Sequence, residues 1–420
     1  MKRLSTVLIV AVCLGLVTAS VIALEMPKGI DLTVKPRVKL GVDVLFEKHM
    51  NMIEGKKVGL ITNPTGVDSK LRATADLLAA SPDVELVALY GPEHGIRGGV
   101  QGHLEDSVDR KTNVPVYSLY GKTRRPTAES LKNVDILFFD IQDIGSRTYT
   151  YISTMEEAMR AAAEHKVKFV VLDRPNPVNG LIVDGPMLEP EFKSFIGIGN
   201  IAYMHGMTIG ELAQFFNKEF EINCDLEVIK MEGWNRDMTW LDTGLIWVPT
   251  SPHIPEADTS WFYPITGIFG ETPLVNIGVG YTLPFKLVGA PWMKAEEVAK
   301  ALNDKNVPGA YFEPFYYKPY YYHYKEENCE GFRIVITDEK TIKPVEVGYH
   351  IIEVLMKMYP ENFNFKLDKV KNRLSAFDRS NGSDKIRKMM EEGITTSRIV
   401  ESFQKEQDEF RKKRAHYLLY

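Results

Sequence analysis

Short apolar runs bounded by turn residues recur along the first part of the chain. Each run is rich in β-branched or aromatic residues, which is typical of a buried strand. The runs that predict strands are 57–61, 84–90, 114–119, 134–139, 168–172, 226–229 and 245–248. Apolar residues at helical spacing predict helices over 71–80, 151–165 and 208–220, the last beginning at a capping box of Thr208 and Glu211. This alternation predicts an α/β fold with a Rossmann-like, doubly wound, mostly parallel sheet.

The pattern changes beyond about residue 264. Glycine and proline interrupt the chain, a tyrosine-rich stretch covers 311–324, and a further strand is expected at 332–336. The charged, amphipathic tail at 384–420 predicts a pair of packed helices. We therefore expect a Rossmann-like catalytic domain at 40–265 and a smaller α+β domain at 266–420. The tyrosines are expected in aromatic packing, with a sugar-binding wall as the alternative.

The first residues have the pattern of an export signal. Lys2 and Arg3 precede an apolar run at 7–17, and Ala23 with Val21 two residues earlier suits cleavage. The run is near the short end for a membrane span, so an uncleaved anchor is the weaker alternative. We predict a signal peptide at 1–23 and an exported protein, periplasmic or extracellular, with no membrane span after cleavage.

Charge and cysteine content limit the expected binding partners and the way in which the fold is stabilised. The net charge is −5, and acidic and basic residues are mixed along the chain. Without a basic stripe, nucleic acid is not an expected partner. After signal cleavage only Cys224 and Cys329 remain, and one disulfide is too few to stabilise a fold of this size without a hydrophobic core. The pattern does not say whether these two cysteines pair.

Polar residues follow the predicted strands. The carboxyl ends of strands in an open α/β sheet meet at one crevice, where ligands usually bind. The candidates there are Asn63 after the first strand; Glu93, His94 and Arg97 after the second; Asp140, Gln142, Asp143 and Arg147 after the fourth; Asp173, Arg174 and Asn176 after the fifth; and His253 after 245–248.

Glu93 is the strongest of these candidates. A turn needs Gly91, Pro92 and Gly95, but nothing in a turn requires a carboxylate followed by an imidazole. The others have structural alternatives. Turn chemistry can explain Asn63, pairing with Arg147 can explain Asp140, a loop network can explain Asp173 with Arg174, and a structural hydrogen bond can explain His253.

Several other chemistries lack their motifs. The chain contains no G-x-S-x-G or H-E-x-x-H, and no G-x-G-x-x-G after the first strand. Glu93, His94, Asp140 and Asp143 could form an oxygen-rich metal site, but they lack a defined ligand spacing. We therefore predict no metal and no cofactor, and acid/base chemistry by carboxylates.

Three blocks occur in order: Gly-Pro-Glu-His-Gly at 91–95, Phe-Asp-Ile-Gln-Asp-Ile-Gly-Ser-Arg at 139–147, and Leu-Asp-Arg-Pro-Asn-Pro at 172–177. In these blocks the chain resembles the bacterial exo-β-N-acetylmuramidase family. Further matching blocks lie at 205–208, 232–234, 249–253, 270–272 and 417–420, so the resemblance covers nearly the whole mature chain. It implies a Rossmann-like domain with a smaller second domain, and hydrolysis of β-linked N-acetylmuramic acid from non-reducing ends of peptidoglycan fragments. It also implies that Glu93 is catalytic.

Glycoside chemistry gives the candidates roles as hypotheses. Glu93 would be the general acid, tuned by His94 or Arg97. Asp140 or Asp143 would act as base or nucleophile, or would orient the acetamido oxygen of the substrate to attack. The lactyl carboxylate of the sugar is expected to bind a cationic side chain. The candidates are Arg97, Arg147 and Arg174. The remaining expected substrate contacts are Asn63, Gln142, Asp173, Asn176 and His253.

Two other functions compete with this one. The first is a metal-dependent hydrolase that acts on another cell-wall bond. The second is a non-catalytic glycan-binding protein that uses the tyrosine-rich stretch and Trp261.

Overall fold

The computed structural model describes residues 28–30, 35–99, 105–270, 272–365 and 376–420. The expected signal peptide at 1–23 and Glu271 of the 270–272 block lie outside the described residues.

The larger domain is built on a seven-stranded sheet within the described residues, in the order β3-β4-β2-β1-β5-β6-β7. The strands are β1 (Lys57–Thr62), β2 (Glu85–Gly91), β3 (Ser107–Val108), β4 (Pro115–Ser118), β5 (Ile136–Asp140), β6 (Lys168–Leu172) and β7 (Leu226–Ile229). Neighbouring strands are parallel except β3, which pairs antiparallel with β4 at the edge. The chain order reverses between β1 and β5. This confirms the predicted doubly wound, mostly parallel sheet.

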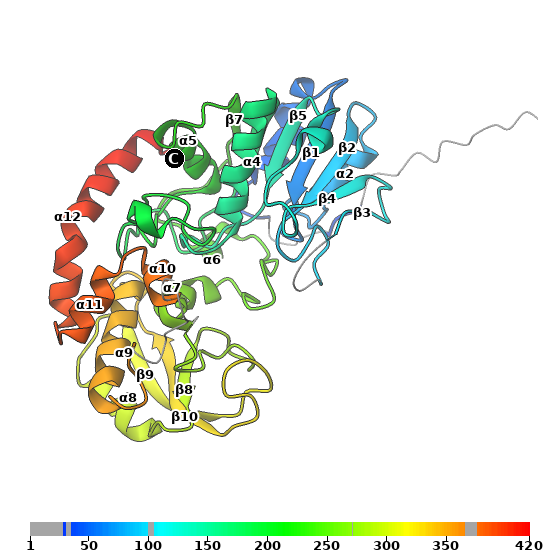
Figure 1. The fold of residues 1–420 in the computed structure, drawn as a ribbon. Coiled ribbons are helices and arrows are strands. Elements are labelled where there is room, and N and C mark those ends of the chain that lie inside the picture. The colour runs from blue at the N-terminus through cyan, green and yellow to red at the C-terminus, as the bar shows by residue number, and fades with distance from the viewer. Residues whose placement is uncertain (1–27, 31–34, 100–104, 271, 366–375) are drawn as a thin grey trace, which may run out of the picture.

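Helices cover both faces of this sheet (Figure 1). Along β5, Ile136 and Phe138 join the hydrophobic cluster that contains α1 (Gly41–Lys48) and α2 (Thr74–Ala80). Leu137 and Phe139 join the cluster on the other face, with α3 (Ala128–Leu131), α4 (Tyr151–His165) and α5 (Ile209–Glu219). Because both faces are buried, the strands are continuously apolar in sequence.

Two predicted helix starts had different outcomes. α5 begins after Thr208, whose Oγ1 accepts from the N–H of Glu211 at 3.2 Å while the Glu211 carboxylate accepts from the N–H of Thr208 at 3.0 Å, which confirms the capping box. α2 begins at Thr74 rather than at 71, because Leu71 has a φ of +59° and cannot continue a helix. The Asp68 carboxylate holds this turn by accepting from the N–H of Arg72 at 2.7 Å.

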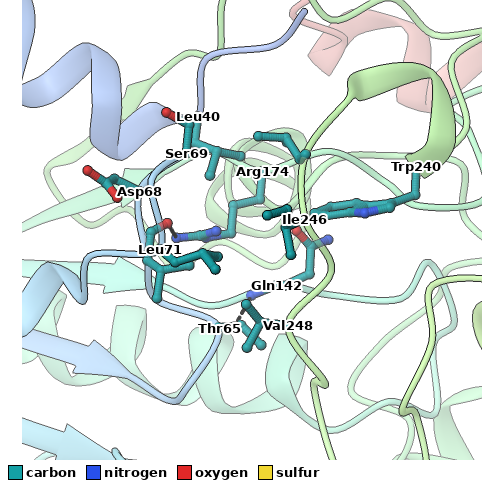
Figure 2. A pocket seen from close by; sticks show the side chains of 12 residues that line it. Leu40, Thr65, Asp68, Ser69, Leu71, Gln142, Arg174, Trp240, Ile246 and Val248 are labelled. Carbon is teal, nitrogen blue, oxygen red and sulfur yellow. Dashed lines mark hydrogen bonds between the residues drawn. The ribbon is translucent and has the colours of Figure 1, made fainter. Parts of the chain in front are cut away.

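The predicted strand at 245–248 is wrong. The short helix α6 (Trp240–Thr243) ends at Gly244, whose φ is +71°, and the chain then runs without strand pairing. Leu245, Ile246 and Val248 instead pack over the carboxyl end of the large sheet (Figure 2). An apolar run that covers another element has the same sequence pattern as a buried strand.

The second domain contains a three-stranded antiparallel sheet in the order β8-β10-β9 within the described residues. Its strands are β8 (Leu287–Ala290), β9 (Ala310–Tyr317) and β10 (Cys329–Ile336), and its helices are α7 (Thr259–Gly270), α8 (Ala295–Asn303), α9 (Pro344–Met358), α10 (Ala376–Asn381), α11 (Lys385–Glu391) and α12 (Thr396–Arg414). β10 contains the predicted strand at 332–336, and α11 with α12 forms the predicted helical tail. The expected domain limit at 265/266 falls inside α7. The tyrosine-rich stretch divides between β9 and the loop that follows it.

The two domains share one continuous hydrophobic cluster, which extends from Ile61 in β1 to Phe410 in α12. α12 runs along one side of the molecule from the second domain to α5 (Figure 1), where the rings of Phe410 and Tyr417 lie 5.8 and 5.2 Å from that of Phe215. Cys224 and Cys329 are buried and unpaired. In the part of the chain that the structure describes, no helix is both long and apolar enough to cross a membrane.

Candidate active site

A wide cleft of about 550 Å³ lies at the carboxyl end of β2, where the second domain meets the large sheet. Both domains supply its walls, which are rich in aromatic side chains. The described residues that line it are Glu93, His94, Tyr120, 148–151, 194–196, Ser251, His253, Ile254, Tyr263, Gly267, Ile277, Val279, Phe285, Tyr321, Tyr322, Arg379 and Ser380.

Glu93 lies in a tight turn that directly follows β2. The N–H of Gly95 donates to the carbonyl of Pro92 at 2.9 Å, and this closes the turn around Glu93 and His94. His94 has a φ of +70°, a left-handed conformation that usually falls to glycine at this turn position. Such a residue costs about 1–3 kcal/mol and persists where the surroundings hold it, most often at functional sites. The backbone therefore holds Glu93 at the edge of the cleft at some cost in stability.

Two hydroxyl groups hold the Glu93 carboxylate. Thr150 Oγ1, from the residue that precedes α4, donates to Glu93 Oε2 at 3.1 Å. Burial, and then a hydrogen bond to the Glu93 carboxylate, raise the pKa of Tyr120. Glu93 itself is half-buried and open to the cleft. A carboxyl group that is fixed on one side and open to a ligand on the other is suited to proton transfer.

The loop at 249–253 forms the rim of the cleft beside Glu93. The hydroxyls of Tyr149 and Tyr151 donate to Thr250, at 2.6 Å to its Oγ1 and at 2.7 Å to its carbonyl. His253 Nε2 lies 2.5 Å from the hydroxyl of Tyr321, which joins the two domains across the rim. Burial, and then the proximity of His94, lower the pKa of His253, which favours its neutral imidazole. The structure thus brings His253 and His94 together with Glu93.

A second, narrow pocket lies where the strand order reverses between β1 and β5 (Figure 2). Thr65, Gln142 and Arg174 from the sheet edge face Trp240 and Ile246 across it. Its volume is about 20 Å³, which leaves room for about one water molecule. Doubly wound sheets usually bind ligands at this reversal, but here the segment at 240–248 covers it.

Asp140 and Arg174 form a fully buried ion pair beside this narrow pocket. Arg174 Nε lies 2.6 Å from Asp140 Oδ1, and Thr74 Oγ1 donates to Asp140 Oδ2 at 2.6 Å. Arg174 Nη2 also donates to the carbonyl of Val67 at 2.8 Å. Both polar groups are therefore engaged within the protein, and neither residue lines the wide cleft.

Asp143 is also held by its own surroundings. One of its oxygens accepts from the N–H of Gly145 at 2.7 Å and lies 3.4 Å from His205 Nε2. Asp143 is buried and outside the lining of the wide cleft. The structure therefore separates both of the expected second carboxylates from Glu93.

Arg97 and Arg147, like Arg174, have internal partners. Arg97 Nη2 lies 2.7 Å from Asp76 and 2.7 Å from Asp109. Arg147 is fully buried, and its guanidinium donates to four backbone carbonyls, those of Pro186 (2.7 Å), Ile201 (2.8 Å), Ser380 (3.0 Å) and Asn381 (2.9 Å). Neither arginine lines the wide cleft.

The remaining candidates hold the loops at the sheet edge. Asn63 Oδ1 accepts from the N–H of Thr65 at 2.9 Å, Gln142 Nε2 donates to the carbonyl of Pro175 at 2.7 Å, and Asn176 Nδ2 donates to the carbonyl of Met207 at 3.0 Å. Asp173 accepts from Thr208 Oγ1 at 2.9 Å and from the hydroxyl of the C-terminal Tyr420 at 2.6 Å. None of these four side chains lines the wide cleft.

Sequence reasoning missed several residues of the cleft. Tyr120 follows the predicted strand at 114–119, so the rule that pointed to the ends of the other strands would have found it. Thr150 and Arg379 gave no such signal, because one precedes a helix and the other comes from the second domain. Within the described ranges, no group of three or more His, Cys, Asp or Glu side chains is placed to hold a metal ion.

Comparisons with known proteins match the chain along most of its length. Residues 58–258 match the family model "Exo-beta-N-acetylmuramidase NamZ, N-terminal", and residues 261–420 match the corresponding C-terminal model. Peptidoglycan beta-N-acetylmuramidase NamZ of Bacillus subtilis (strain 168) is 45% identical over 388 residues, which cover 92% of this chain and 92% of that protein. Two crystal structures of DUF1343 family proteins from Bacteroides fragilis NCTC 9343 are also similar. One has a TM-score of 0.88 at 44% identity, over 92% of this chain and 100% of that chain. The other has a TM-score of 0.72 at 29% identity, over 91% and 99%.

Proposed function

This chain belongs to the exo-β-N-acetylmuramidase family, and we propose that it removes β-linked N-acetylmuramic acid from the non-reducing ends of peptidoglycan fragments, with Glu93 as the general acid. The family membership confirms the resemblance of the ordered sequence blocks. One observation carries the catalytic assignment: Glu93 is held by Thr150 at 3.1 Å and faces the wide cleft.

Hydrolysis of a glycosidic bond passes through an oxocarbenium-like state, and the departing oxygen needs a proton. In the proposed reaction Glu93 gives its proton to that oxygen as the bond to the anomeric carbon breaks. Water supplies hydroxide to the anomeric carbon and a proton that restores Glu93, so one water is consumed per bond. The hydroxyls of Thr150 and Tyr120 orient the carboxyl group.

We assign Asp140 and Asp143 to the support of the loops rather than to the reaction. The oxygens of Asp140 accept from Arg174 and Thr74, each at 2.6 Å, and Asp143 accepts from Gly145 at 2.7 Å. A nucleophile or base needs a free lone pair that faces the substrate. The contacts of Asp140 leave it no such oxygen. Asp143 Oδ1 has no hydrogen-bond partner among the described residues, but Asp143 does not line the wide cleft, so a positioning role is favoured for both residues.

Product analysis on defined oligomers of alternating N-acetylmuramic acid and N-acetylglucosamine tests this function. We expect single N-acetylmuramic acid residues to be released from oligomers that carry this sugar at the non-reducing end. Oligomers that begin with N-acetylglucosamine should stay intact. NMR of the first product identifies the anomer and hence the stereochemistry. Release of internal fragments, or of N-acetylglucosamine, would contradict the proposal.

The metal-dependent alternative is tested by exhaustive metal removal. A chromogenic β-glycoside of N-acetylmuramic acid should be cleaved at the same rate before and after chelation. A loss that added zinc or another divalent ion restores would favour that alternative. Turnover of the glycoside itself excludes a protein that only binds glycans.

We also propose that the protein is exported and processed near Leu24. The charged start, the apolar run at 7–17 and Ala23 support this, and peptidoglycan lies outside the cytoplasmic membrane. Mass spectrometry of protein from the periplasm or the medium should find a chain that begins near Leu24. A full-length chain confined to the cytoplasm would contradict it.

A further inference from the structure

N-Acetylmuramic acid differs from N-acetylglucosamine by a lactyl ether, whose carboxylate is ionised at neutral pH. A site that selects the first sugar over the second therefore benefits from a cation in reach of this group. Arginine is the most suitable side chain, because its guanidinium matches a carboxylate with two parallel hydrogen bonds.

The three arginines expected for this task have other partners. Arg97 is paired with Asp76 and Asp109, Arg147 donates to four backbone carbonyls, and Arg174 is paired with Asp140. Breaking the buried pair of Arg174 and Asp140 to bind substrate would leave an unpaired buried charge, which is strongly unfavourable. The cation for the lactyl group has to come from elsewhere.

Arg379 in α10 meets this requirement. It is the only Lys or Arg among the described residues that line the wide cleft. Its side chain is half-buried, and its Nε is buried with no hydrogen-bond partner among the described residues. The neighbouring Asp378 lies 2.9 Å from Arg387 Nε and so is paired with another cation. A buried N–H without an acceptor is unfavourable, so turning this guanidinium toward a ligand carboxylate breaks no hydrogen bond at Nε and can give it an acceptor.

The backbone beside Arg379 is firmly held. Arg147 donates to the carbonyls of Ser380 at 3.0 Å and Asn381 at 2.9 Å, and the hydroxyl of Tyr349 donates to Asn381 Oδ1 at 2.6 Å. These contacts connect the large sheet's loops to α10 in the second domain. A side chain whose backbone is fixed before the ligand arrives binds it with less loss of entropy. Arg147 thus holds the backbone of α10 next to Arg379.

We propose that Arg379 binds the lactyl carboxylate of the terminal N-acetylmuramic acid and is the specificity-determining cation of the cleft. This inference rests on the proposed function. It places carboxylate recognition in the second domain and proton donation, by Glu93, at the edge of the first. Both domains are then required to recognise and cleave one sugar.

Arg124 is the competing cation. Its guanidinium lies 5.0 Å from the ring centre of Tyr120 and 3.9 Å from that of Phe195, two residues that line the cleft. Arg124 itself is exposed and stacks on these rings instead of lining the cleft. In solvent a pair with a carboxylate contributes little, so Arg124 is the weaker discriminator.

The test compares two substrates and four variants of the full chain. The substrates are a chromogenic β-glycoside of N-acetylmuramic acid and its lactyl methyl ester, which lacks the charge. For Arg379→Gln we expect kcat/KM to fall about 10- to 100-fold on the acid, in line with a lost charge-assisted hydrogen bond, and to stay nearly unchanged on the ester. Arg379→Lys should fall in between. Arg398→Gln, at an exposed site on α12, is the matched control.

A parallel loss on both substrates would show a structural role and overturn the inference. So would an unchanged ratio in Arg379→Gln, or a selective loss in Arg124→Gln in its place. The wild-type protein tests the idea without any variant, because equal kcat/KM on acid and ester would contradict it. A wild type that cleaves neither substrate would overturn the proposed function as well, which separates the two failures.

Discussion

Two hollows lie at the same end of the large sheet and differ in almost every respect. The narrow pocket at the reversal between β1 and β5 has about 20 Å³ of space, and the wide cleft at the end of β2 has about 550 Å³. The segment at 240–248 covers the narrow pocket, whereas the C-terminal domain forms the far wall of the wide cleft. The reversal point is the usual ligand site of a doubly wound sheet, but here it is filled.

The polar groups of the two hollows differ in the same way. Beside the narrow pocket, Asp140 and Arg174 satisfy each other, with Thr74 as a further donor. In the wide cleft, Glu93 is open to the ligand and Arg379 Nε has no described partner. Polar residues that are satisfied within the fold stabilise it, whereas those that line a cleft and lack a protein partner are available to a ligand.

The largest expected effect belongs to the wide cleft. Glu93→Gln keeps the shape of the side chain but removes its proton, so kcat on a natural disaccharide should fall about 10²- to 10⁴-fold. The loss should be much smaller on a dinitrophenyl glycoside, whose leaving group needs no proton. Glu401→Gln, on the exposed face of α12, is the control. Equal losses on both substrates would mean that Glu93 is not the acid.

The next effect belongs to the narrow pocket and concerns stability. Asp140→Asn leaves Arg174 as a buried charge with no anionic partner, and should lower the free energy of unfolding by about 3–5 kcal/mol. Denaturant titration measures this. Asp304→Asn, from an exposed pair with Lys300 at 2.6 Å, should change it by less than about 1 kcal/mol. Full stability with lost turnover in Asp140→Asn would instead make Asp140 a catalytic residue.

A smaller loss is expected where the C-terminus supports the sheet edge. The hydroxyl of Tyr420 donates to Asp173 at 2.6 Å and accepts from the N–H of Met231 at 2.8 Å. Tyr420→Phe should lower the free energy of unfolding by about 1.5–3 kcal/mol, the range for a hydrogen bond to a charged group. Tyr316→Phe, at a 59% exposed tyrosine, should be neutral. Equal stability of the two variants would contradict this.

The last expected effect, which is spread over two pH units, is a pH dependence at the contact between the domains. Asp184 accepts from the N–H of Val345 in α9 at 2.8 Å, and burial raises its pKa to about 6 from 3.8. The folded state therefore holds more protons, so this carboxyl's contribution to stability is complete below pH 3.8 and is lost as the pH rises through 6. Between pH 4 and 6 the wild type should lose up to about 1.4 kcal/mol per pH unit more than Asp184→Asn. Parallel stability curves would contradict it.

Much of the fold was predictable because local pattern and tertiary structure agree. β6, β7 and α4 have the predicted limits, since each is a regular element packed by its own apolar residues. The run at 245–248 failed because its apolar residues cover the sheet edge instead of pairing with a strand. Sequence alone does not separate these two ways of burying an apolar segment.

The site was predictable only in part. Glu93 stood out because a turn does not require its carboxylate. The sequence could not show which arginine is free to bind substrate, because the partners of the arginines are distant in sequence. Arg147, for example, donates to the carbonyls of Pro186 and Asn381. Arg379 has no sequence signal, because only the approach of the second domain brings it to the cleft.

A crystal structure of Glu93→Gln with a disaccharide of N-acetylmuramic acid β-linked to N-acetylglucosamine tests the central claim most directly. We expect the sugar in the wide cleft, with the amide that replaces the Glu93 carboxylate within hydrogen-bonding distance of the glycosidic oxygen, and with the lactyl carboxylate on Arg379. Density for the sugar between Thr65 and Ile246 at the narrow pocket, with the wide cleft empty, would contradict this account.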